Sequence, residues 1–471
     1  MNHGPAEDKT ATGKNTAEQS FKDKKILVMG LGLLGGGVET VKFLAQNKAN
    51  LTVTDLRSKL QLKAVLRTLK RIKNILYVLG RHARKDFINS DLIVKNPGVK
   101  PDSPFLEIAR KHHTPITSDM GIFFKNYPGH IIGVTGTRGK STTAYLIWKF
   151  LKAGLDQKKS PKVFLGGNIG KSALEFIPLV KNRDWVVLEL SSFQLHDLAL
   201  EKQSPEIAVL TNIFPDHLNW HKNFVDYLRS KSCIFSFQKK DDLIFINGED
   251  KICQRAVKGA KAKIILVTPR LPKKLEKIVI QNLGQHHKNS VALARAVAKH
   301  FDIGDQKVLK VLKKFRGLGG RQEIVKTVGG VTWINDTTST MPEATIAALN
   351  RFSILAEKTS GRLILIAGGQ DKNLDFKKMA RAIDKSVSVL ILLPGKATEK
   401  LKKSLEKTGF KEKNMVEIDS MLEAVTKAKN LAQKGDLIIF SPGATSFGLF
   451  NNEFDRGRQF LNSIKRLTKH P

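Results

Sequence analysis

The chain has 471 residues, with 80 lysine and arginine residues against 43 aspartate and glutamate residues and a formal net charge of +37. This length exceeds what one compact core supports, so it predicts two or three domains. Two cysteines at no zinc-binding spacing exclude a disulfide framework. The sequence shows no charged-then-apolar leader and no long apolar run, so we expect a soluble, reduced, cytoplasmic protein without a membrane span.

The positive charge raises the question of nucleic-acid binding. In stretches such as "KLKKSLEKTGFKEK" at 400–413, acidic and apolar residues interrupt the lysines at helical spacing, without the interleaved aromatic residues that stack on bases. The composition therefore favours a solvated basic surface and no specific nucleic-acid partner.

In chain order, residues 1–20 are polar and almost free of large apolar residues, which predicts a disordered tail. Residues 21–117 alternate β-rich runs, "KILVMG", "LTVTD" and "DLIVKNPG", with amphipathic stretches such as "VETVKFLAQN". Residues 118–317 run from "HIIGVTG" through "WVVLELSS" and "IAVLTNI" to "HHKNSVALARAVAKHF". Residues 318–471 contain "LILIAGG", "VLILLPG" and "DLIIFSPG". This alternation predicts mostly parallel sheets in three α/β domains.

The first of these blocks contains a glycine fingerprint. Gly30, Gly32 and Gly35 match G-x-G-x-x-G after a strand, and Asp55 ends the next strand. Alone, this pattern suits a dinucleotide-dependent dehydrogenase, or only tight packing at a turn. Beside a second nucleotide site, it indicates that one nucleotide is the energy source and the other is part of the substrate.

The second site is a phosphate loop in "HIIGVTGTRGKSTT", where a buried strand turns into a helix. Gly136 and Gly139 let backbone N–H groups curl around phosphate, Lys140 supplies a charge, and the Ser141 hydroxyl suits magnesium. The strict motif has glycine where Val134 stands, so the loop is a variant. We expect ATP to be bound by Gly136, Thr137, Arg138, Gly139, Lys140, Ser141 and Thr142.

Glu189 ends an apolar strand, where a carboxylate is costly unless it meets a cation such as magnesium. Asp216 and His217 follow another strand, and Lys231 lies on a predicted helix 14 residues after His217. Taken singly, His217 suits a loop histidine and Lys231 a surface lysine.

Seven motifs change that interpretation: "TGTRGKST", "GGNIG", "LELSSFQL", "TNIFPDHLNWH" with Lys231, "GGR" at 319–321, "INDTTSTMPEA" and "SPGATSFGLF". They stand in the order found in the Mur ligases, and the resemblance extends from residue 21 to about 465. It implies a Rossmann-like UDP-binding domain at 21–117, a central P-loop ATPase-type domain with a mostly parallel sheet at 118–317, and a Rossmann-like amino-acid-binding domain at 318–471.

The "ELSSFQL" version of the third motif is similar to the glutamate-adding branch of the family. This resemblance implies an ATP-dependent ligase that adds D-glutamate to UDP-N-acetylmuramoyl-L-alanine through an acyl phosphate. The reaction would belong to cytoplasmic peptidoglycan precursor synthesis, and so to cell wall biogenesis, cell shape and cell division. The implied partners are these small molecules, and we expect a monomer.

The resemblance also implies residue roles. Lys140 and Ser141 would hold ATP and magnesium, Glu189 would share the first ion, and His217 and Lys231 would serve a second ion, with Lys231 as a carbamate. Arg321 and Asp336 would face ATP. The UDP-sugar would be bound by Leu33, Leu34, Asp55, Arg57, Gly98 and Asn168, and the amino acid by Thr340, Lys372 and Ser446.

Some positions depart from the family pattern. Thr338 stands where a lysine is usual, Gly448 where an acid is common and Glu453 where an aromatic residue is usual, and the "HNxxN" pattern appears only as "HHKNS". These departures leave open L-glutamate or another amino acid as acceptor. A folylpolyglutamate-synthase-like ligase and a basic P-loop protein that moves on nucleic acid are further alternatives. The N-terminal glycine fingerprint argues against the first and the scattered lysines against the second.

Overall fold

The computed structural model describes residues 20–33, 35–155, 161–169, 171–218, 220–315, 317–446, 449–450 and 452–467. The predicted tail therefore lies outside the described residues except for Ser20, and Leu34 and Gly448 lie outside them too. The chain divides into two compact units, residues 1–271 with 289–311 and residues 272–288 with 312–471. In the described residues, no helix has both the length and the apolar character needed to cross a membrane.

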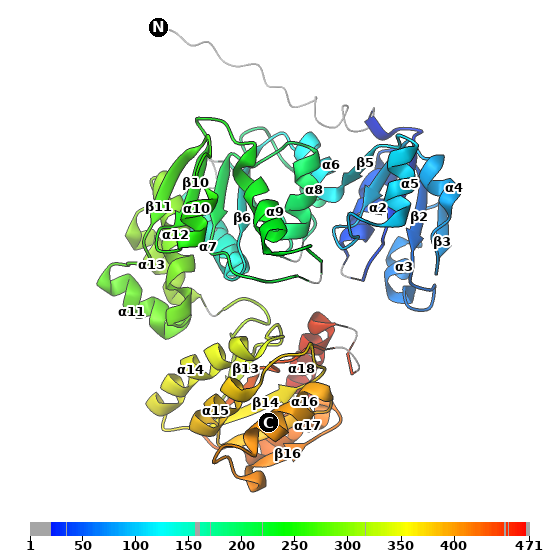
Figure 1. The fold of residues 1–471 in the computed structure, drawn as a ribbon. Coiled ribbons are helices and arrows are strands. Elements are labelled where there is room, and N and C mark those ends of the chain that lie inside the picture. Colours follow the sequence, from blue (N-terminus) through cyan, green and yellow to red (C-terminus); the bar gives the residue numbers. More distant parts are fainter. Residues whose placement is uncertain are drawn as a thin grey trace. The chain divides into compact units, whose positions relative to one another are not determined.

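The first unit begins with a five-stranded parallel sheet in the order β3-β2-β1-β4-β5, shown in blue in Figure 1. Ile26 and Val28 of β1 lie in one core and Leu27 and Met29 in another, because successive side chains of a strand point to opposite faces. The elements are β1 (Lys25–Met29), α2 (Gly36–Gln46), β2 (Asn50–Asp55), α3 (Lys63–Leu69), β3 (Ile75–Leu79), α4 (Arg84–Ile88), β4 (Leu92–Lys95), α5 (Pro104–Lys111) and β5 (Ile116–Ser118).

The same unit contains a six-stranded parallel sheet, β11-β10-β9-β6-β8-β7, in which β6 lies between β8 and β9. The strands are β6 (His130–Thr135), β7 (Val163–Gly167), β8 (Trp185–Glu189), β9 (Ile207–Leu210), β10 (Leu243–Asn247) and β11 (Lys263–Val267). The helices are α6 (Asp119–Asn126), α7 (Lys140–Gly154), η1 (Ala173–Leu179), α8 (Ser192–Leu200), α9 (Phe224–Ser236), α10 (Lys251–Ala256), α12 (Lys288–His300) and α13 (Asp305–Lys314). The first residue of α12 and the last three of α13 belong to the second unit.

The second unit is built on a mixed sheet in the order β12-β13-β17-β14-β15-β16, yellow to red in Figure 1. Its strands are β12 (Glu323–Val328), β13 (Val331–Asn335), β14 (Leu363–Gly368), β15 (Val389–Leu393), β16 (Met415–Glu417) and β17 (Leu437–Phe440). Its helices are α11 (Lys273–Asn282), η2 (Gln285–His287), α14 (Pro342–Lys358), α15 (Lys377–Ser386), α16 (Lys396–Leu405), η3 (Glu412–Asn414), α17 (Met421–Leu431) and α18 (Glu453–Leu467).

The α/β fold class with three mostly parallel sheets is confirmed, and "HIIGVTG", "LILIAGG" and "DLIIFSPG" form β6, β14 and β17. One feature was not predicted: β12 pairs antiparallel with β13 through a two-residue turn, so the last sheet is mixed. Gly329 and Gly330 have φ angles of 58° and 80°, which such a turn requires of both central residues. The domain boundaries near 118 and 318 stay predictions.

Candidate functional site

The phosphate loop follows β6 and ends where α7 begins. Gly139 has a φ of 82° immediately before α7, a left-handed conformation that glycine adopts without strain. Gly136 has a φ of 146°, and a Cβ there would lie 1.9 Å from Oγ1 of Thr211. Lys140 and Ser141 are the first residues of α7, so the unbonded amides of a helix start face this loop. The local structure therefore suits an anion.

Asn212, in the segment that follows β9, holds the phosphate loop in place. Its carbonyl accepts the Thr137 N–H at 2.9 Å, its Oδ1 accepts the Arg138 N–H at 2.8 Å, and its Nδ2 donates to the Arg138 carbonyl at 3.0 Å. The Thr137 hydroxyl lies 2.9 Å from the Tyr227 hydroxyl of α9. The amides of Thr137 and Arg138 are thus already bonded, which leaves phosphate binding to later amides and to side chains.

Lys231 lies behind the loop and is 2% exposed. Its Nζ donates to the carbonyl of Gly136 at 2.8 Å and stands 4.7 Å from the ring centroid of Tyr227. Burial, and then the charge of Lys140, lower the pKa of Lys231 well below its ordinary value, although Asp216 and Glu189 oppose this shift. The interpretation of Lys231 as a surface lysine is therefore wrong, and its amine loses its proton far more readily than one in water.

Glu189 ends β8 and is also 2% exposed. Its Oε1 accepts a hydrogen bond from Nδ2 of Asn168 at 3.2 Å, whereas its Oε2 is buried without a hydrogen-bond partner. A buried carboxylate oxygen without a donor is costly, and a cation would compensate it. The structure thus brings the predicted Asn168 and Glu189 together, and the donor set fits a metal ion.

His217 lies in the loop after β9 with a φ of 54°, and its ring packs edge-on against Phe193 at a centroid distance of 5.1 Å. Its Nε2 lies 3.8 Å from Oδ2 of Asp216, and Nη1 of Arg138 lies 3.8 Å from the same oxygen. Desolvation lowers the pKa of His217 despite Asp216, which favours the neutral, metal-binding form of the imidazole. In the described part of the chain, no three His, Cys, Asp or Glu side chains form a metal cluster.

Four of the predicted UDP-sugar residues end or follow strands of the first sheet at its carboxyl edge: Leu33, Asp55, Arg57 and Gly98. Asn168 follows β7 of the other sheet in this unit, and Leu34 lies outside the described residues. Oδ2 of buried Asp55 accepts the Gly32 N–H at 3.1 Å, and its Oδ1 accepts the Arg57 N–H at 2.9 Å. Gly98 follows β4, where its N–H donates to Oδ1 of Asn96 at 3.0 Å. Leu33, in the turn after β1, is 38% exposed. The Asp55 carboxylate thus ties the turn after β1 to the start of the segment after β2.

The second unit carries the remaining predicted residues around the carboxyl ends of β13, β14 and β17. Asp336 is buried, and its carboxylate accepts hydrogen bonds from the Gln322 N–H and from the hydroxyls of Ser339 and Ser441. Burial raises the pKa of Asp336 to about 6. The Asp336 carboxylate therefore links the segment after β13 to Gln322, before β12, and to Ser441, after β17. The other predicted residues here are Arg321 and Lys372, which are exposed, Thr340, which is half-buried, and Ser446, which is buried.

Sequence reasoning assigned no role to Asn212 and Tyr227, the two residues that fix the phosphate loop. Asn212 lies in the quoted "TNIFPDH" motif, directly after the strand that neighbours β6. Asn212 comes soon after the carboxyl end of β9, and the phosphate loop follows the carboxyl end of β6. Because the carboxyl ends of adjacent parallel strands share one edge of the sheet, this position could have predicted that Asn212 reaches the loop. Tyr227, on α9 one turn before Lys231, gave no comparable signal.

Comparison with family models identifies three consecutive regions. The Mur ligase MurD-like N-terminal domain matches residues 24–118, the Mur ligase middle domain 134–304, and the Mur ligase glutamate ligase domain 320–443. A UDP-N-acetylmuramoylalanine–D-glutamate ligase of Borreliella afzelii is 38% identical over 468 residues, which cover 95% of this chain and 99% of that protein. A protein of the same name from Roseiflexus is 35% identical over 474 residues, covering 94% and 99%.

Solved structures agree in fold. The UDP-N-acetylmuramate-alanine ligase MurC of Thermotoga maritima superimposes with a TM-score of 0.61 at 18% identity, covering 94% of this chain and 100% of that one. MurF of Acinetobacter baumannii gives a TM-score of 0.54 at 14% identity, covering 98% and 100%. At such identities the likeness concerns the fold alone.

Proposed function

The chain belongs to the Mur ligase family, and from this premise we propose that it joins D-glutamate to UDP-N-acetylmuramoyl-L-alanine at the expense of ATP. Relatives that are 38% and 35% identical to this chain are named for that activity, and the match covers 99% of each of them. The observation that carries the proposal within the molecule is the pair of buried ionisable side chains, Lys231 and Glu189, behind a glycine-rich phosphate loop.

The reaction needs a phosphate-binding site because an amine cannot displace an oxide ion from a carboxylate. The carboxylate must first be activated by ATP. Transfer of the γ-phosphoryl group of ATP to the carboxylate of the alanyl residue makes an acyl phosphate, and the glutamate amine then displaces phosphate to form the amide. Lys140 would neutralise charge on the transferred group. The amides at the start of α7 would hold the neighbouring phosphates.

Magnesium fits the donor set, and Ser141, Glu189, His217 and Lys231 would hold it, as two ions if Lys231 is a carbamate. Bound there, magnesium would withdraw charge from the phosphoryl oxygens. The unpartnered Oε2 of Glu189 and the lowered pKa of the His217 imidazole support this assignment.

The lowered pKa of Lys231 also supports the carbamate. Only an unprotonated amine attacks carbon dioxide; its nitrogen forms a bond to carbon, one proton leaves, and a carboxylate-like anion results. The carbamate would turn the buried Lys231 side chain from a cation into an anion that can bind a metal ion. The positive charge of Lys140 would stabilise this anion.

Substrate recognition is assigned in the same way. We infer that the UDP-sugar binds at the edge of the first sheet around Leu33, Leu34, Asp55, Arg57 and Gly98, with Asn168 near the reacting carboxylate. The adenine nucleotide would also contact Arg321 and Asp336, and the incoming amino acid would contact Thr340, Lys372 and Ser446. The dependence on ATP and the free thiols of Cys233 and Cys253 support a cytoplasmic enzyme. We also propose that the enzyme is a monomer, which light scattering would test.

The decisive experiment is phosphate release from ATP with UDP-N-acetylmuramoyl-L-alanine in the presence of D-glutamate, L-glutamate or no amino acid. We expect release with D-glutamate only. Release with L-glutamate alone would show that Thr338 and Glu453 mark a changed acceptor site. Release with neither, from folded protein, would overturn the proposal.

A further inference from the structure

Arg456 is a buried cation whose hydrogen bonds go to neutral groups. It lies in the first turn of α18 and is 1% exposed. Nη2 donates to the carbonyl of Thr337 at 2.7 Å, Nη1 donates to the carbonyl of Ala444 at 3.0 Å, and Nε lies 3.4 Å from Oγ1 of Thr337. Burial lowers the pKa of Arg456 to about 10, so the guanidinium keeps its charge at neutral pH. Because a buried charge without a carboxylate partner is costly, filling space does not account for this residue.

The two carbonyls belong to segments that the proposed function places around the incoming amino acid. Thr337 follows β13 and lies three residues before Thr340. Ala444 follows β17 and lies two residues before Ser446. Strands β13 and β17 are parallel neighbours, so their carboxyl ends lie side by side. The planar fork of one guanidinium spans both segments and fixes the separation of the two carbonyls.

Thr445 extends this link to a third segment. Its N–H donates to the carbonyl of Gln370 at 3.1 Å, and its carbonyl accepts the Gln370 N–H at 3.0 Å. Its hydroxyl also donates to the Gln370 carbonyl, at 3.1 Å. Gln370 follows β14 and lies two residues before Lys372. The segments after β13, β14 and β17 are thus joined by hydrogen bonds, with Arg456 between the first and the last.

The helix that carries Arg456 is fixed to the sheet. Phe460, one turn later in α18, is buried, and its ring centroid lies 4.9 Å from that of Phe440 in β17. The hydroxyl of Thr337 donates to the carbonyl of Glu453, the first residue of the helix, at 3.0 Å. A side chain that projects from a packed helix can set the positions of the groups that it bonds.

We propose that Arg456 is a positioning residue of the acceptor amino-acid site. It acts through the segments after β13 and β17, which it holds at the separation at which Thr340 and Ser446 bind the amino acid together. This inference rests on the function proposed above, and it adds a residue that carries no contact to any substrate in that proposal.

The test compares the steady-state kinetics of Arg456→Met with those of Arg351→Met in the full chain. Arg351 is the matched control, since it is a buried arginine of the same unit that donates to the carbonyls of Gln322 and Asn282, outside the three segments. We expect Arg456→Met to raise the KM for D-glutamate about tenfold or more and to change the KM for UDP-N-acetylmuramoyl-L-alanine less than about twofold. Arg351→Met should lower the melting temperature too, but leave the KM for D-glutamate within about twofold of wild type.

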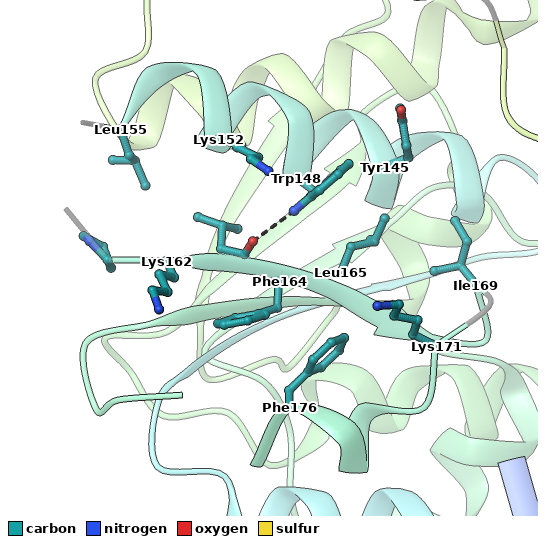
Figure 2. Close-up of a pocket in the computed structure, with 12 residues that line it drawn as sticks. Tyr145, Trp148, Lys152, Leu155, Lys162, Phe164, Leu165, Ile169, Lys171 and Phe176 are labelled. Carbon is teal, nitrogen blue, oxygen red and sulfur yellow. Dashed lines mark hydrogen bonds between the residues drawn. The ribbon is translucent and has the colours of Figure 1, made fainter. Parts of the chain in front are cut away.

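Two milder variants separate positioning from stability. Thr337→Val removes the hydroxyl next to Nε of Arg456 at nearly constant size, and should raise the KM for D-glutamate about threefold. It tests the same link if Arg456→Met does not fold. Trp148→Phe removes a hydrogen bond in the first unit, from Nε1 to the carbonyl of Val163 in edge strand β7 at 3.0 Å (Figure 2). It should lower the melting temperature without raising the KM for D-glutamate.

An unchanged KM for D-glutamate in Thr337→Val and in folded Arg456→Met would overturn the proposal. An equal rise in Arg351→Met would do the same, because it would reduce the effect of Arg456 to general stability. A failure of the proposed function shows in a different measurement, since the wild type would then release no phosphate with D-glutamate, and this inference would fall with it.

Discussion

Nζ of Lys231 donates a 2.8 Å hydrogen bond to the carbonyl of Gly136, which joins α9 to the first glycine of the phosphate loop. The ammonium is buried beside a second cation, Lys140, and burial and that neighbour lower its pKa. A lysine held in this way is poised to lose its proton and react.

Replacement of this lysine tests the carbamate. We expect Lys231→Ala to reduce turnover at least about 100-fold, because a metal ligand is lost, and short carboxylic acids such as formate to restore part of it. Lys222→Ala, at an exposed lysine near the start of the same helix, should leave turnover near wild type. Carbon-13 NMR with labelled carbon dioxide should show a carbamate signal in the wild type only; its absence there at full activity would contradict the assignment.

Glu189→Gln tests the metal ligand without changing side-chain size. The amide binds magnesium poorly, so we expect the magnesium concentration for half-maximal turnover to rise at least about tenfold, with a lower maximum. Exposed Glu249→Gln is the matched control. An unchanged magnesium dependence in Glu189→Gln would place the ligand on another residue.

Asn212→Ala removes two side-chain hydrogen bonds to Arg138 in the phosphate loop. We expect a loss of stability of about 1–3 kcal/mol and a raised KM for ATP, since the loop loses its support. Asn50→Ala, which removes a bond to the carbonyl of Asp23 in the first sheet, should affect stability without affecting KM. Equal KM values for the two variants would show that Asn212 does not hold the loop for nucleotide.

Asp119 provides a pH-dependent prediction. Burial raises its pKa to about 6 from an ordinary 3.8, with Asp197 adding to the shift and Lys95 opposing it. The folded state thus holds this proton more tightly than the unfolded state, so this contribution to stability is complete below about pH 4 and declines as the pH rises through about 6.

We expect Asp119→Asn to stabilise the protein by about 2–3 kcal/mol near pH 7.5 and by little near pH 4, because the amide is neutral at both. Urea unfolding of variant and wild type at the two pH values measures the difference. Asp336, whose pKa is also raised to about 6, remains in both proteins and cancels. A gain of equal size at both pH values would contradict the prediction.

The buried ion pair between Nζ of Lys95 in β4 and Oδ2 of Asp197 in α8, 2.7 Å apart, suits a double-mutant cycle. Lys95→Met or Asp197→Leu alone should cost about 3–5 kcal/mol, since each leaves a charge buried without its partner. The double variant should cost much less than the sum, as measured by urea unfolding. Additive losses would show that the pair is not coupled.

The strands and the phosphate loop could be predicted because their signals are local. Apolar runs that end at glycine indicated β6, β14 and β17, and the resemblance of the motifs to a known family predicted that Lys140, Glu189 and Lys231 belong to one site. The antiparallel β12 could have been predicted too, since Gly329 and Gly330 between valines indicate a hairpin.

Other features depend on contacts that no local pattern encodes. Lys95 and Asp197 are 102 residues apart, and only the fold brings them together. The burial of Lys231 likewise arises from the packing of α9 against the loop, which is why the residue alone resembled a surface lysine.

The amides of Thr137 and Arg138, both bonded to Asn212, carry a consequence for the rate at which nucleotide arrives. Their conformational entropy is lost when the chain folds and not when ATP binds. Their protons should therefore exchange slowly with deuterium in the nucleotide-free enzyme. Association should then need no backbone rearrangement at these two residues, and the group that must change partner is Nζ of Lys140, which donates to the Thr137 carbonyl at 3.1 Å.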